Sequence, residues 1–168
     1  MRVSHVCSTV FQWVSVALAL LCVSTSLVAD GSGLVDAVRN GDVQTVRSLL
    51  KGGADPNQAA PDGSTAVHWA VHDDNLAMLN ALLDAGAKPD GVTRYRIAPL
   101  TLAAQNGNAA IVERLLTAGA NPDTASEEGQ TALMTAARNG SVAAVRALLK
   151  RGAQVGLAES FRGQTALM

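Results

Sequence analysis

Cysteine and aromatic residues are scarce in this chain of 168 residues. Both cysteines, Cys7 and Cys22, lie near the N-terminus, so the sequence from residue 30 onward has no thiol for a disulfide, a thiolate metal ligand or a nucleophile. Only 3% of the residues are aromatic although 48% are hydrophobic. Alanine and leucine therefore have to supply the core, and they suit tight spaces between helices.

The chain also lacks a strong charge of either sign. It has 13 basic and 14 acidic side chains, and residues 1–29 contribute only Arg2, which leaves 12 basic against 14 acidic groups. This balance does not favour nucleic acid or an anionic membrane as a partner. The sequence contains no glycine-rich phosphate loop and no G-x-S-x-G nucleophile elbow, so neither an enzyme activity nor a cofactor is predicted.

Residues 1–29 have the pattern of a secretory signal peptide. Arg2 supplies a positive start, the apolar run 13–23 follows, and small residues come next. Cleavage is expected after Ala29 or after Ser26, with export to the periplasm, the exterior or the lumen of the secretory pathway. The alternative is an uncleaved membrane anchor, for which the run is short against the roughly 20 residues of a spanning helix. No stable membrane insertion is expected once the segment is removed.

A period of 33 residues dominates the rest of the chain. Gly53, Gly86, Gly119 and Gly152 each follow a Leu-Leu pair and precede an alanine. Self-similarity at a fixed period means that each unit is one supersecondary element, which buries its apolar side only against its neighbours. The sequence therefore predicts a solenoid, whose function lies on its surface.

A second string begins eleven residues after each of the first three of these glycines. It reads STAVHWA at 64–70, IAPLTLA at 97–103 and QTALMTA at 130–136. Together with the 33-residue period, these strings resemble the T-P-L-H-x-A signature of the ankyrin repeat. The resemblance covers residues 30–168, with repeats at about 30–60, 61–93, 94–126 and 127–160 and a partial fifth at 161–168. It implies an all-α solenoid of stacked helix-turn-helix units joined by β-turns, and a role in binding other proteins.

Local chemistry indicates the same helices. Thr65 and Thr131 are suited to cap a helix N-terminus, whereas Ala98 is not, although Pro99 fits the first helical position. The third repeat is therefore expected to fray more easily. Gly41, Gly107 and Gly140 suit a tight left-handed turn between two helices, where the second repeat has Asp74. Helices are predicted near 34–39, 43–51, 66–72, 76–84, 99–105, 109–117, 132–138 and 142–150.

The second helix of each repeat carries apolar residues at three- and four-residue spacing, which predicts one buried face. These residues are Val43, Val46, Leu49, Leu50, Leu76, Leu79, Leu82, Leu83, Ala109, Val112, Leu115, Leu116, Val142, Val145, Leu148 and Leu149. The segment 162–168 starts a further repeat, from which we expect the natural chain to continue.

One cluster hints at chemistry. His68 and His72 are four apart on a predicted helix and Asp73 follows, so three ligands could hold a metal ion or support hydrolysis. The favoured interpretation gives His68 a structural role, because it lies three residues after Thr65 and can bond back to the cap as in a capping box. Trp69 also stands where an H-E-x-x-H zinc motif needs glutamate. No metal site is predicted.

The resemblance implies that turn tips and the exposed ends of the first helices face a protein partner. The corresponding residues are Pro61, Asp62, Ser64, His72, Asp73, Arg94, Tyr95, Gln105, Asn106, Glu127, Glu128, Gln130, Arg138 and Asn139. Tyr95 is the predicted anchor with Arg94 beside it, flanked by His72 and Arg138. Arg96 occupies the place of Gly63 and Gly129, so a turn-favouring residue has been given up there. A spacer segment of a longer protein is a further alternative.

Overall fold

The structure, a computed structural model, describes residues 32–168, and the predicted signal peptide lies outside this range. The helices are α2 (Ser32–Arg39), α3 (Val43–Lys51), α4 (Ala66–His72), α5 (Leu76–Asp84), α6 (Pro99–Asn106), α7 (Ala109–Thr117), α8 (Ala132–Arg138) and α9 (Val142–Lys150). All eight predicted helices are confirmed. The first begins two residues earlier than predicted and the fifth ends one residue later. No helix in the described range is long and apolar enough to span a bilayer.

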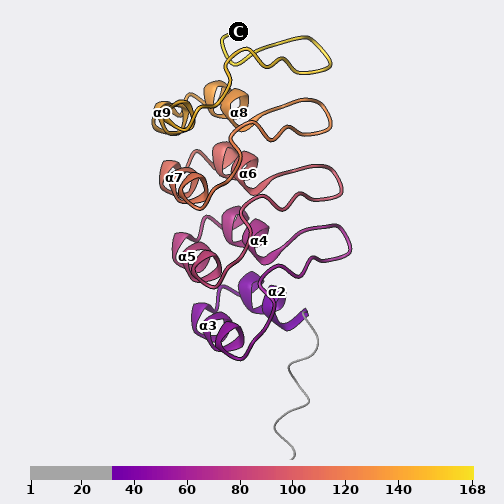
Figure 1. Ribbon diagram of the computed structural model, residues 1–168, viewed down its shortest axis with the longest axis vertical. Coiled ribbons are helices and arrows are strands. Elements are labelled where there is room, and N and C mark those ends of the chain that lie inside the picture. Colours follow the sequence, from indigo (N-terminus) through magenta and orange to yellow (C-terminus); the bar gives the residue numbers. More distant parts are fainter. Residues whose placement is uncertain (1–31) are drawn as a thin grey trace, which may run out of the picture. The chain divides into compact units, whose positions relative to one another are not determined.

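The described residues form one compact unit of stacked helix pairs. Helices α2, α4, α6 and α8 pack on one another in sequence, and α3, α5, α7 and α9 form a second layer beside them (Figure 1). The loop that enters each of α4, α6 and α8 projects away from the second layer, and a fourth loop follows α9 (Figure 1). The unit therefore has two helix layers and a row of loops.

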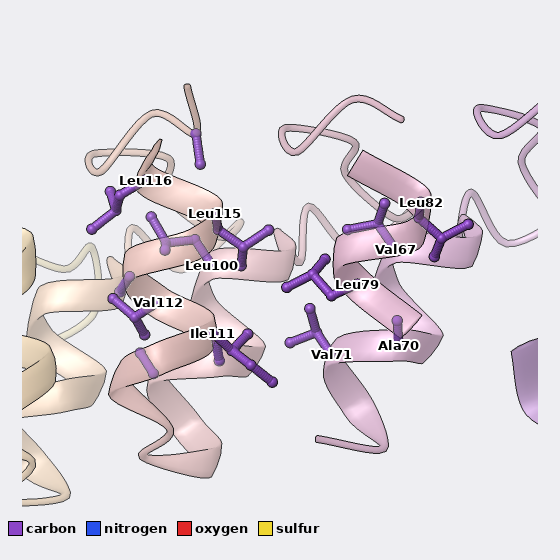
Figure 2. Packing of buried hydrophobic residues seen from close by; sticks show 14 of the residues in the cluster. Val67, Ala70, Val71, Leu79, Leu82, Leu100, Ile111, Val112, Leu115 and Leu116 are labelled. Carbon is purple, nitrogen blue, oxygen red and sulfur yellow. The ribbon is translucent and has the colours of Figure 1, made fainter. Parts of the chain in front are cut away.

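The core lies between the helix pairs. Leu79 and Leu82 of α5 and Leu115 of α7 are fully buried, and they lie between successive pairs with Val71 and Leu100 of the first layer (Figure 2). Burying a side chain of this size stabilises the fold by roughly 1.5–3 kcal/mol. The unit is therefore held together mainly between repeats.

The predicted apolar faces of the second helices are correct in their centres and wrong at some positions. Val142 is 68% exposed and Leu149 is 43% exposed, because no further helix among the described residues covers α9. Conversely, Met78, Ile111 and Ala144, which the pattern did not include, are buried. Each lies two positions after one predicted residue and one position before the next, so the buried face of each helix is wider than the pattern predicted.

The turns between paired helices have the predicted left-handed conformation. Asp74 has φ = 56°, close to the 74° of Gly107, so the second repeat keeps the turn without glycine. The side chain of Asn108 donates to Asp74 Oδ1 at 2.9 Å and fixes this aspartate. Side chains also cap α3, α5 and α7, as where Asn75 Oδ1 accepts from the backbone N–H of Met78 at 3.0 Å. Such caps satisfy N–H groups that have no partner within the helix.

The starts of α6 and α8 agree with the sequence prediction, whereas at α4 the Thr65 hydroxyl lies 3.0 Å from His68 Nδ1. Thr131 Oγ1 accepts from the backbone N–H of Met134 at 3.4 Å, whereas Ala98 makes no side-chain cap and Pro99 takes the first turn of α6. The start of α6 therefore lacks one hydrogen bond that α8 has.

Candidate binding surface

Four tight loops form what we call the hairpin row. Hairpin 1 (59–65), hairpin 3 (125–131) and hairpin 4 (158–165) each close with an isolated antiparallel bridge. Hairpin 2 (92–98) has no such bridge, but the backbone N–H of Thr93 donates to Ile97 O at 3.1 Å. The row projects from the first helix layer (Figure 1), so its tips are available to a partner.

Neighbouring hairpins are joined by backbone hydrogen bonds at two places. The N–H of Arg94 donates to Asp62 O at 2.7 Å, which joins hairpin 1 to hairpin 2. The N–H of Ser160 donates to Glu128 O at 2.8 Å, which joins hairpin 3 to hairpin 4. At both joints a left-handed glycine permits the close approach: a Cβ on Gly63 would lie 3.1 Å from the backbone nitrogen of Arg94. A Cβ on the equivalent Gly129 would meet Ser160 at the same distance.

The joint between hairpin 2 and hairpin 3 is different. Arg96 stands at the position of Gly63 and keeps the left-handed turn, with φ = 55°. Its Cβ, however, occupies the space through which the next hairpin approaches at the other joints. No backbone hydrogen bond among the described residues joins these two hairpins; by register it would run from Glu127 to Tyr95. The hairpin row is therefore interrupted next to Tyr95.

Hairpin 2 carries the predicted anchor. Tyr95 is 64% exposed, and Arg94 and Arg96 are exposed on either side of it. The guanidinium of Arg94 donates to Pro61 O at 3.0 Å and so is held against hairpin 1. Ser64 was also expected on this surface, but it is buried: its hydroxyl and its N–H both donate to Asp62 Oδ1, which draws the side chain under the tip.

Four of the other predicted contact residues lie at the ends of the first helices. Two of them pair with each other, and two bond to the backbone of the preceding repeat. His72 and Asp73 are exposed and lie 2.9 Å apart, from His72 Nδ1 to Asp73 Oδ1. In contrast, Asn106 donates through Nδ2 to Val71 O at 2.9 Å, and Asn139 donates to the carbonyl of the preceding repeat. Both amides satisfy carbonyl groups at a helix C-terminus, which lack partners within that helix.

The acceptor for Asn139 is the backbone oxygen of Gln105, at 2.9 Å, and the side chain of Gln105 is exposed. Arg138 is exposed at the end of α8. It lines a hollow of about 750 Å³ together with Glu128, Met134, Phe161, Arg162 and Met168. The predicted residues therefore extend over three repeats and do not converge on a single point.

An aromatic cluster that the sequence analysis missed lies beside His72. The guanidinium carbon of Arg39 is 4.7 Å from the centroid of the Trp69 ring, and the His72 ring meets Trp69 edge-on at 5.9 Å. The indole Nε1 is buried and has no hydrogen-bond partner within residues 32–168. The sequence did contain a signal for this proximity. Arg39, His72 and Arg138 are separated by multiples of 33 residues, so they occupy equivalent positions at the ends of the first helices of their repeats.

His68 lies inside, as the capping interpretation predicts. Its Nδ1 accepts from the backbone N–H of Thr65 at 3.1 Å, and its Nε2 lies 3.1 Å from Ile97 O of the next repeat. An Nδ1 that accepts and an Nε2 that donates define the neutral ring. Burial is the main cause that lowers the pKa of His68, and the nearby Ile97 carbonyl and Asp62 oppose it.

The metal alternative required His68, His72 and Asp73 to share one ion. Both ring nitrogens of His68 already have partners within the protein, while His72 is exposed and bonded to Asp73. Over the part of the chain that the structure describes, no three histidine, cysteine or acidic side chains are grouped so that they could hold a metal ion.

Two comparisons with known proteins bear on these repeats. A family model described as ankyrin repeats, in three copies, matches residues 34–126 and again residues 100–168. A search of curated proteins gave no match to the chain. The two matched ranges overlap and together span residues 34–168, which include all of the described helices except the first two residues of α2.

Proposed function

The chain belongs to the ankyrin-repeat family, and we propose that it is the partner-binding part of an exported, non-catalytic protein. Ankyrin repeats are generally protein–protein interaction modules and are typically non-catalytic. The observation that carries the proposal is Tyr95, a large side chain left 64% exposed on a loop that projects from the first helix layer (Figure 1). Loops held by a packed scaffold are common places for binding residues.

Tyr95 is the proposed anchor, and Arg94 is fixed beside it through Pro61 O. Tyrosine and arginine are enriched among the residues that dominate interface energy, where truncation costs roughly 2 kcal/mol or more. His72, Asp73, Gln105 and Arg138 are proposed as flanking contacts at the ends of the first helices. Asn106 and Asn139 belong to the same surface but act by holding it in shape, because their amides bond to backbone carbonyls.

The binding proposal is tested with a partner captured by the purified protein and identified by mass spectrometry. The double variant Tyr95→Ala/Arg94→Ala should bind that partner at least about tenfold more weakly with little change in melting temperature. The matched control is Val142→Ala/Arg146→Ala, which removes one exposed apolar side chain and one exposed arginine from α9. Equal loss of affinity in both double variants would place the interface elsewhere.

Export is proposed from the pattern of residues 1–29, with removal of the segment after Ser26 or Ala29. Intact-mass measurement of the abundant cellular form, combined with fractionation, tests this. We expect the protein outside the cytoplasm with Leu27 or Asp30 at its N-terminus. An abundant form that retains Met1 and stays in the cytoplasm would contradict export without touching the binding proposal.

A further inference from the structure

The tips of the hairpin row alternate in charge. Asp62 lies on hairpin 1, Arg94 and Arg96 lie on hairpin 2, and Glu127 and Glu128 lie on hairpin 3; all five are exposed. A positive loop therefore stands between two negative loops, with the Tyr95 ring on the positive one. The two ion pairs found among the described residues, His72–Asp73 and Arg114–Asp84, include neither arginine of hairpin 2.

The side chain of Arg96 differs from that of Arg94 in having no hydrogen bond to the protein among the described residues, whereas the Arg94 guanidinium donates to Pro61 O. Its backbone also has a left-handed conformation that an arginine adopts less favourably than glycine does. In addition, its Cβ stands where a glycine permits the adjacent hairpins to be joined. Strained backbone that persists in a fold clusters at binding and switch regions.

We propose that Arg96 is a specificity-determining residue that binds a carboxylate on an extended segment of a partner protein, and that Tyr95 packs against the same segment. This inference rests on the proposed binding function. A guanidinium presents a planar pair of N–H donors that matches the two oxygens of a carboxylate. An arginine with no internal partner can offer this pair in full.

The charges on the adjacent hairpins narrow the partner further. Asp62 on one side and Glu127 and Glu128 on the other repel a polyanion such as a nucleic acid. They favour basic side chains on either side of the bound carboxylate. The partner segment therefore has one aspartate or glutamate with lysine or arginine nearby, a pattern of charge opposite to that of the hairpin row.

The experiment uses a displayed library of random 12-residue peptides, selected on the purified protein. We expect the selected peptides to share an acidic residue with basic residues within a few positions of it. For the tightest peptide, exchange of that acid for its amide should lower affinity about tenfold, since a charge-assisted hydrogen-bond pair is lost. Fluorescence anisotropy with labelled peptides measures both affinities.

Three variants then locate the charge that the peptide recognises. Arg96→Asn keeps a Cβ and tolerates the left-handed turn, so it removes the charge and little else. In this variant the acid-to-amide exchange should change affinity by less than about twofold, because the coupled group is absent. Arg96→Lys should give an intermediate effect, and the control Arg146→Gln, on α9, should retain the full tenfold effect.

The outcomes separate this inference from the function it rests on. Selected peptides without a shared acid, or an acid whose exchange has the same effect in Arg96→Asn as in the wild type, would overturn the role of Arg96 and leave peptide binding intact. A selection that enriches no peptide for binding to the protein would count against both the role of Arg96 and the proposed binding function. Circular dichroism of each variant checks that the fold is unchanged.

Discussion

Two neighbouring joints of the hairpin row have the same register and differ at the residue where the backbones approach, which is glycine in one and arginine in the other. Between hairpins 1 and 2, Gly63 lets the backbones approach and the N–H of Arg94 donates to Asp62 O. Between hairpins 2 and 3, Arg96 stands at the glycine position and the corresponding bond is absent. The first helices pack on each other at both joints. The comparison teaches that the helix layers stack independently of the hairpins, so the hairpin row can vary without loss of the fold.

The largest expected effect comes from the layers that the two joints share. Leu82 and Leu115 are equivalent positions of successive repeats and both are fully buried. Leu82→Ala and Leu115→Ala should each lower the free energy of unfolding by about 2–5 kcal/mol, measured by urea denaturation. Leu149→Ala, at a position 43% exposed, should cost about 1 kcal/mol or less. A loss confined to one of the two buried positions would show that the helix layers also differ between the joints.

The next effect tests the close approach at the first joint. An alanine at Gly63 has to adopt φ = 82° and to place its Cβ 3.1 Å from the Arg94 nitrogen, so Gly63→Ala should cost about 1–3 kcal/mol. Gly163→Ala is the matched control, because this glycine is also left-handed, with φ = 65°, but has nothing within 4 Å of the added Cβ. The difference in unfolding free energy between the two variants measures the cost of the close contact between the added Cβ and the Arg94 nitrogen. Equal costs would show that this contact does not explain why glycine is needed at residue 63.

How well the sequence predicts each region depends on how far apart in the sequence the interacting residues lie. The helices and their glycine-marked ends depend on residues within one period, and they were predicted almost to the residue. The hairpin joints depend on backbone groups 32 residues apart, such as those of Asp62 and Arg94, whose distance no local pattern contains. The same holds for Asn106, whose amide reaches Val71 O, and for Arg39, which lies over Trp69.

The third prediction uses a contact between the repeats that meet at the first joint, the hydrogen bond from His68 Nε2 to Ile97 O. Burial lowers the pKa of His68 below its ordinary 6.5, so as the pH falls the unfolded chain takes up this proton before the folded one does. The neutral His68 ring therefore makes its full contribution to the free energy of unfolding above about pH 6.5. This contribution is lost as the pH falls from 6.5 to the lowered pKa of the folded state. One proton limits the slope to about 1.4 kcal/mol per pH unit.

Urea denaturation at pH 7.5, 6.0 and 5.0 measures this dependence in the wild type and in His68→Gln. The stability difference between them should narrow as the pH falls, because only the wild type loses the contribution of the neutral His68 ring. A constant difference over this range would show that His68 keeps the same protonation in the folded and unfolded states.

The smallest effect, and the only gain in stability, is expected when the glycine of the first joint is introduced at the second joint. Arg96→Gly removes the strain of a left-handed arginine and the Cβ that separates hairpins 2 and 3, which should raise the free energy of unfolding by about 1 kcal/mol. The added freedom of glycine in the unfolded chain offsets part of this gain. Hydrogen exchange tests whether the hairpins of Arg96→Gly approach each other as those at Gly63 do. If they approach, the N–H of Glu127 should be protected from exchange by a hydrogen bond to Tyr95 O. Arg96→Asn, which keeps a Cβ, should leave that amide unprotected. Protection in both variants, or in neither, would mean that something other than the Cβ at residue 96 holds the two hairpins apart.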